Sequence, residues 1–125
     1  VKFLEDALEM TEKTLGEKDP AMANRLNNLA ACLASQGKHK KAIQLYEKAL
    51  TINTTTLGET HPLVGDTLNN LAVTWHDIGD NQKAAQYLEQ AIEIYSENYG
   101  ENHPRVIQSQ QILKLLKSNS GCFIM

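Results

Sequence analysis

Two pairs of adjacent asparagines, Asn27-Asn28 and Asn69-Asn70, are the residues whose type and spacing most clearly suggest binding chemistry. The second pair follows the first by 42 residues. An Asn amide has two donors and an acceptor, so it can bond both the N–H and the C=O of an extended peptide. The four amides are therefore candidates for fixing a peptide backbone. The alternative is that one Asn of each pair bonds a neighbouring helix or loop and holds the fold together.

Catalytic chemistry is not indicated by the remaining polar residues. His76 beside Asp77 would suggest a base and its orienting acid, but neighbouring residues of a helix point apart and no nucleophile recurs nearby. The two cysteines, Cys32 and Cys122, show no metal-ligand spacing and no disulfide framework. We therefore expect no enzymatic activity, no cofactor and no metal.

The last four residues, Cys122-Phe123-Ile124-Met125, follow a Ser/Asn/Gly spacer and match the pattern of a farnesylation site. Cys122 is thus a candidate for prenylation, which would give a lipid anchor and membrane association. One prenyl chain anchors weakly, and the sequence shows no polybasic stretch or second cysteine beside it. The alternative is that this apolar tail packs on the domain's own groove or on a neighbouring molecule.

Length and composition describe one ordinary domain of 125 residues, 42% of them hydrophobic. The net charge of −3 gives no general attraction to nucleic acid. No apolar run is long enough for a transmembrane segment. Few cysteines are typical of a reducing compartment, so we expect a cytoplasmic protein.

An internal repeat organises the chain. Prolines 20, 62 and 104 are 42 residues apart, and 15–56 aligned on 57–98 without gaps gives 16 identities. Such a period is typical of stacked units that cannot bury their apolar faces alone.

Each unit is predicted to contain two helices, because apolar residues recur every three or four positions. We expect A helices over 20–36, 62–78 and 104–118, and B helices over about 2–14, 39–54 and 81–96. His61 and His103 precede two of the A helices and are expected to cap them. In the last A helix, an apolar stripe of Val106, Ile112, Leu113 and Leu116 is expected, with Ser109 on its polar outer face.

The strings L-G-E-x-[HD]-P, L-N-N-L-A, G-x(3)-K-A and A-[LI]-x-I resemble the tetratricopeptide repeat, specifically its 42-residue form found in kinesin light chains and nephrocystin-type proteins. The resemblance implies an all-α fold in which antiparallel helix pairs form a superhelix, an α-solenoid. It also implies a concave groove, lined by the A helices, that grips a peptide or a partner helix. We expect the repeat domain to span 1–118, about two and a half repeats with an N-terminal truncation, followed by a tail over 119–125.

On this resemblance the groove lies on the side of the A helices opposite their leucines. The candidate peptide-binding residues are Asn24, Asn27, Asn28, Ala31, Ser35, Asp66, Asn69, Asn70, Val73, His76 and Asp77. A third, divergent copy contributes Gln108, Gln111 and Leu115.

The ligand's charge is predicted from this stripe, which contains no Lys or Arg. A carboxylate clamp and the binding of acidic peptides, both known in the family, are therefore not expected. Asp66 and Asp77 make the stripe slightly acidic, which favours a neutral or basic peptide.

The function predicted from these features is that of an adaptor or scaffold, which binds a protein partner without catalysis. The alternative is a structural or oligomerisation segment of a longer array with no ligand site of its own. Apolar residues near the N-terminus, Phe3, Leu4 and Leu8, lack a preceding partner helix, so we expect the isolated chain to self-associate.

Overall fold

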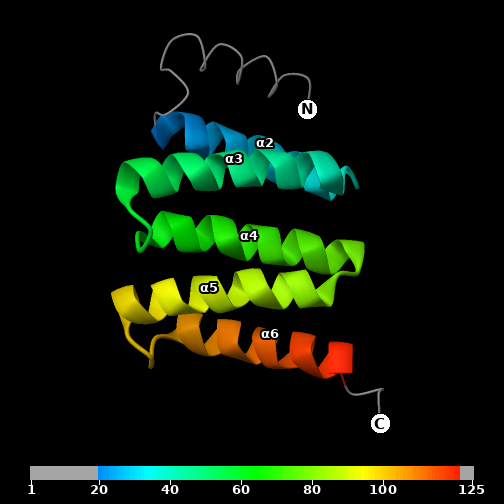
Figure 1. Ribbon diagram of the computed structural model, residues 1–125, viewed down its shortest axis with the longest axis vertical. Helices are drawn as coiled ribbons and strands as arrows, with labels where there is room; N and C mark the ends of the chain where they lie inside the picture. The colour runs from blue at the N-terminus through cyan, green and yellow to red at the C-terminus, as the bar shows by residue number, and fades with distance from the viewer. Residues whose placement is uncertain (1–19, 122–125) are drawn as a thin grey trace. The chain divides into compact units, whose positions relative to one another are not determined.

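The computed structural model describes residues 20–121, and within that range it contains helices and no strand (Figure 1). The helices are α2 (Pro20–Ser35), α3 (His39–Leu57), α4 (Pro62–Ile78), α5 (Asn81–Tyr99) and α6 (Pro104–Gly121). The predicted alternation of A and B helices is confirmed over this range. The expected helix over 2–14, the prenylation candidate Cys122 and the apolar residues at both ends lie outside the described residues.

The B helices extend further than predicted, α3 to Leu57 and α5 to Tyr99. The run Thr54-Thr55-Thr56 reads as a helix end, because threonine is a weak helix former. In the structure the Thr56 hydroxyl donates to the Ile52 carbonyl oxygen at 2.7 Å, a bond made within the helix. The helix ends at Leu57, before Gly58, where φ becomes +97°.

The described chain falls into two compact units, the first ending at Glu59 and the second beginning at Thr60. In the first unit α2 packs on α3 through a core of Met22, Ala23, Leu26, Ala49 and Ile52. The second unit contains α4, α5 and α6, with α5 packed against both of the others. Its core cluster consists of Ala72, Ala84, Ala85, Leu88 and Leu116.

The helices of the second unit approach closely because small residues face each other. Ala72, Ala84 and Ala91 are all buried. Gly65 of α4 permits a further close contact, since a Cβ atom there would lie 2.9 Å from Cε1 of Tyr95 and 3.2 Å from Cγ2 of Ile94. The absence of a side chain at position 65 therefore allows the Tyr95 ring to pack directly on the backbone of α4.

The N-terminal ends of α4 and α6 are capped by the histidines predicted to cap them. His61 Nδ1 accepts a hydrogen bond from the Leu63 N–H at 3.1 Å, and His103 Nδ1 accepts one from the Arg105 N–H at 3.1 Å. Both histidines therefore act as N-caps, as expected. At the other end of α4, Gly79 adopts the left-handed conformation with φ of +101° and reverses the chain into α5.

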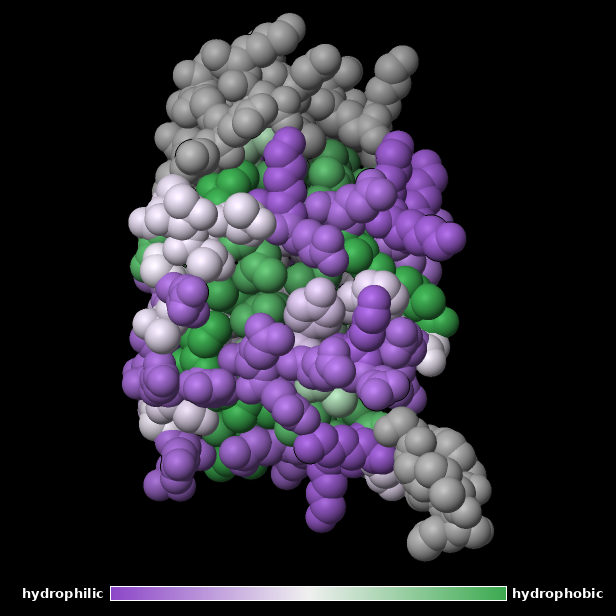
Figure 2. All heavy atoms as spheres, in the orientation of Figure 1, coloured by the Kyte–Doolittle hydropathy of each residue, from purple (hydrophilic) through white to green (hydrophobic). Residues whose placement is uncertain are grey.

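The apolar stripe predicted for the last helix is wrong in two positions. Ser109 is buried rather than on the outer face, whereas Ile112 is 44% exposed. The face that packs inward is formed by Val106, Ser109, Leu113 and Leu116. Apolarity alone misassigned these residues, because Ser109 is small enough to be covered and Ile112 faces a hollow beside α4. Figure 2 shows mostly hydrophilic residues on the visible face of the second unit, with hydrophobic residues between them.

Candidate functional site

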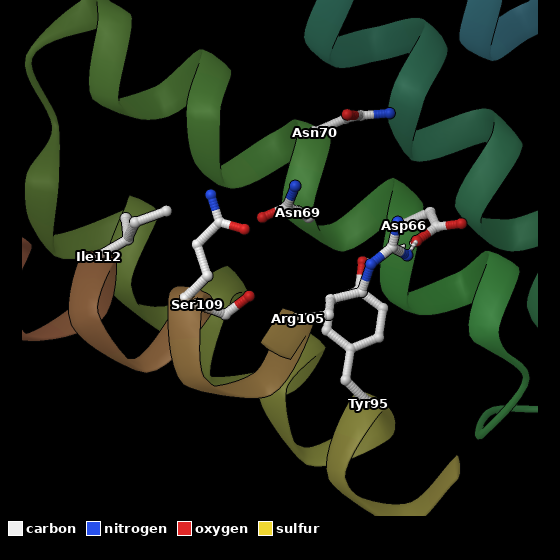
Figure 3. A pocket seen from close by; sticks show the side chains of 8 residues that line it. Asp66, Asn69, Asn70, Tyr95, Arg105, Ser109 and Ile112 are labelled. Atoms are coloured by element: carbon white, nitrogen blue, oxygen red, sulfur yellow. Dashed lines mark hydrogen bonds and ion pairs between the residues drawn. The ribbon is translucent and has the colours of Figure 1, made fainter. Parts of the chain in front are cut away.

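A polar pocket of about 330 Å³ lies in the second unit, lined from α4, α5 and α6 (Figure 3). Its lining residues are Asp66, Asn69, Asn70, Tyr95, Arg105, Gln108, Ser109 and Ile112. Asn69 lies between α4 and α6, whereas the amide of Asn70 extends away from the α6 side chains (Figure 3). Asn69 and Gln108 therefore supply amides from two different helices to the same hollow.

Asp66 is held from two helices at one end of the polar pocket. The Tyr95 hydroxyl donates to Asp66 Oδ1 at 2.7 Å, and Arg105 Nη1 donates to the same oxygen at 2.7 Å (Figure 3). The Arg105 guanidinium also lies over the Tyr95 ring, 5.1 Å from its centroid. These contacts connect α4, α5 and α6 at one point.

The phenol of Tyr95 is kept neutral by its surroundings. Burial raises its pKa above the ordinary value of 10.0, and the hydrogen bond to Asp66 and the negative charge of that carboxylate raise it further. Tyr95 therefore remains a hydrogen-bond donor to Asp66 over the whole neutral range.

The prediction that no Lys or Arg lines the groove is wrong for this pocket, because Arg105 lines it. The predicted stripe of the last A helix began at Gln108, but Arg105 lies one turn earlier on the same face. The ion pair with Arg105 also offsets the negative charge of Asp66. The acidic character expected from Asp66 is thus offset by a neighbouring helix.

An apolar cavity of about 270 Å³ adjoins the polar pocket and shares Asn69 and Ile112 with it. Its other lining residues are Ala72, Val73, His76, Leu88, Leu115 and Leu116. Three of the apolar side chains are strongly exposed: Val73 at 53%, Ile112 at 44% and Leu115 at 63%. The cavity is therefore an open apolar surface between α4 and α6, above Leu88 of α5.

The residues predicted on α4 are distributed over these two hollows. Asp66, Asn69 and Asn70 line the polar pocket, and Val73 and His76 line the apolar cavity. His76 Nδ1 lies 2.7 Å from Asn81 Oδ1, a hydrogen bond that ties the end of α4 to the start of α5. Asp77 is exposed and belongs to neither lining.

The residues predicted on α2 belong to the first unit. Asn24, Asn28, Ala31 and Ser35 are exposed, whereas Asn27 is half-buried and has an interaction partner. The Ser35 hydroxyl donates to the Cys32 carbonyl oxygen at 2.8 Å. Their role in binding stays a prediction.

Several lining residues were not in the predicted site. Arg105 and Ile112 lie three and four positions from Gln108, so helical periodicity extended in both directions would have found them. Ser109 is adjacent to Gln108 and was assigned to the outer face, so this periodicity did not point to it. Tyr95 and Leu88 come from the B helix α5, and nothing in the pattern of the A helices points to them.

Among residues 20–121, no group of three or more His, Cys, Asp or Glu side chains is placed to hold a metal ion. No helix in that part of the chain has the length and apolarity needed to cross a membrane. Prenylation at Cys122, cytoplasmic location and self-association stay predictions.

Comparison with known families gives a match to the tetratricopeptide repeat, over residues 1–55 and 22–97. No curated protein matches the chain significantly.

Several solved structures resemble the chain closely. A kinesin-light-chain-like protein of Podosopora anserina with nearly identical TPR-like repeats is 27% identical, with a TM-score of 0.86 over 96% of this chain and 57% of the other. The protein BtubC (BKLC) of P. vanneervenii is 26% identical, with a TM-score of 0.82 over 96% of this chain and 47% of the other. The chain thus spans about half the length of these proteins. It belongs to the tetratricopeptide repeat family, with all-α repeats of the kinesin light chain type that form a protein-interaction module.

Proposed function

We propose that this chain is an adaptor module that binds an extended segment of a partner protein in the groove between α4 and α6. The observation that carries the proposal is the arrangement around Asn69. This amide borders both the polar pocket and the apolar cavity, and Gln108 contributes a second amide from α6. A peptide lying along the groove would meet backbone-bonding groups and an apolar surface side by side.

The chemistry of the groove favours a ligand without strong charge at this place. An amide satisfies both the N–H and the C=O of a peptide, so Asn69 and Gln108 give affinity with little sequence preference. Asp66 and Arg105 already pair with each other at 2.7 Å. Selectivity would then come from the side chain that enters the apolar cavity beside Val73 and Leu115. The predicted α2 residues would form a separate surface of the same kind on the first unit.

The experiment that tests this proposal begins with selection of peptides from a displayed random library on the immobilised full chain. The affinity of an enriched peptide is then measured for the wild type and for Asn69→Ala. Loss of two hydrogen bonds of about 0.5–1.5 kcal/mol each corresponds to a weakening of roughly 5- to 150-fold.

The matched control is Gln90→Ala, which removes an exposed amide from α5 that lines neither hollow. We expect this variant to bind the peptide as the wild type does. Equal weakening by both substitutions, or no enriched peptide at all, would contradict the proposal.

A further inference from the structure

The apolar cavity between α4 and α6 presents an unusual amount of apolar surface for its size. Val73 and Leu115 are each more than half exposed, yet they border a hollow of about 270 Å³. This volume is below the ~300–1,000 Å³ of typical small-molecule sites. The cavity therefore fits one or two side chains of a polypeptide better than a complete small ligand.

The lining of the cavity also restricts the chemistry of its occupant. It contains no Asp, Glu, Lys or Arg, and its polar members are the side chains of Asn69 and His76. The ring of His76 is already engaged with Asn81 at 2.7 Å. A charged side chain would be desolvated there without a partner, so the cavity favours an uncharged, apolar segment.

The chain itself supplies such a segment directly after α6. Residues 118–125, Ser-Asn-Ser-Gly-Cys-Phe-Ile-Met, contain no charged side chain and end with three large apolar ones. Leu116, on the floor of the cavity, precedes Gly121 by five residues, which is about 7.5 Å along a helix. Phe123 and Ile124 come two and three residues after Gly121 and can span up to about 7 and 11 Å, so their side chains can reach back to the cavity at Leu116.

A glycine stands where the chain would have to reverse. Gly37 and Gly79 follow α2 and α4, and both have positive φ, of +85° and +101°. Gly121 comes 42 residues after Gly79, at the same step of the repeat. A residue without Cβ adopts the left-handed conformation readily, so a reversal at position 121 costs little.

We propose that the segment Phe123-Ile124-Met125 docks in the apolar cavity of its own chain and covers Val73 and Leu115. This contact does not depend on the binding of an external peptide. Where an external peptide also uses the cavity, the tail competes with it and must be displaced first. The tail then lowers the apparent affinity of the groove for an external peptide.

The test compares methyl NMR spectra of the full chain with those of a chain that ends at Gly121. We expect the methyl resonances of Val73, Ile112 and Leu115 to shift on removal of the tail, because the Phe123 ring no longer lies over them. Leu63, an exposed leucine of α4 outside the cavity, should not shift. Adding the synthetic peptide of residues 118–125 to the shortened chain should move the three resonances back.

Two variants of the full chain make the result specific. Phe123→Ser should reproduce the spectrum of the shortened chain, whereas Ser118→Ala should leave the spectrum of the full chain unchanged at the cavity. Identical spectra with and without the tail would overturn the proposal. Shifts that appear only as the protein concentration rises would also overturn it, because the occupant would then be the tail of a second copy.

Discussion

Asp66 was predicted from the sequence to contact a ligand, and in the structure it connects three helices. Its carboxylate oxygen Oδ1 accepts hydrogen bonds from Tyr95 and Arg105, both at 2.7 Å. The ion pair is about half exposed, so its contribution to stability is small, roughly 0–1 kcal/mol. Its importance lies in holding the three helices in register at one end of the polar pocket.

The buried phenol of Tyr95 predicts a loss of stability at alkaline pH. Its pKa is raised in the folded state, first by burial and then by Asp66, whereas the unfolded chain ionises near the ordinary value of 10.0. The resulting stabilisation is fully present below about pH 10 and is lost as the pH rises towards the folded-state pKa.

Tyr95→Phe removes this ionisation, so its urea midpoint should fall less steeply above about pH 10 than that of the wild type. Tyr46, whose pKa burial also raises, remains in both proteins and sets the residual slope. Parallel pH profiles for the two proteins would show that Tyr95 does not contribute.

The close packing around Gly65 predicts that even a methyl group at this position lowers the free energy of unfolding. In Gly65→Ala the new Cβ would lie 2.9 Å from Tyr95 Cε1 and 3.2 Å from Ile94 Cγ2. Overpacking typically costs about 1–3 kcal/mol, while alanine gains at most about 1 kcal/mol in helix propensity. We expect a net destabilisation of about 1–2 kcal/mol by urea unfolding. In a Tyr95→Leu background the same substitution should cost much less, and an equal cost would refute the contact.

At the scale of the element, α4 has two faces with different tasks. Leu71 is fully buried in the core, whereas Val73, two positions later, is 53% exposed beside the apolar cavity. Leu71→Ala should therefore cost about 2–5 kcal/mol in the free energy of unfolding. Val73→Ala should stay within about 0.5 kcal/mol, because exposed positions tolerate truncation.

Chemical denaturation of the two variants measures this difference directly. A similar cost at both positions would mean that the groove face of α4 is part of the core. Weaker peptide binding by Val73→Ala with unchanged stability would in turn separate the binding face from the packing face.

The helices themselves were largely predictable, because their signals are local. Pro62, His61 and Gly79 delimit α4 by backbone chemistry that each residue brings with it. Within the candidate site, the residues predicted from sequence lie on the A helices, as Asn69, Val73 and Gln108 do. Tyr95 enters it through the packing of α5 on α4, and the pattern of the A helices does not contain that information.

At the scale of the molecule, the repeat explains how the candidate site is formed from two helices. A period of 42 residues brings A helices to equivalent positions, so α4 and α6 share one groove although Asp66 and Arg105 are 39 residues apart. The third copy departs most from the others in sequence. It supplies Arg105, Ser109 and Ile112 to the groove of the second unit.

The most direct test of the account is where a selected peptide contacts the chain. Backbone and side-chain amide NMR signals are followed while an enriched peptide is titrated into the full chain. We expect saturable shifts at Asn69 and Gln108, with Val73 and Leu115 responding in parallel and Gln90 of α5 unaffected. Shifts concentrated around Gln90, with Asn69 and Gln108 unchanged, would contradict the assignment of the α4–α6 groove as the binding site.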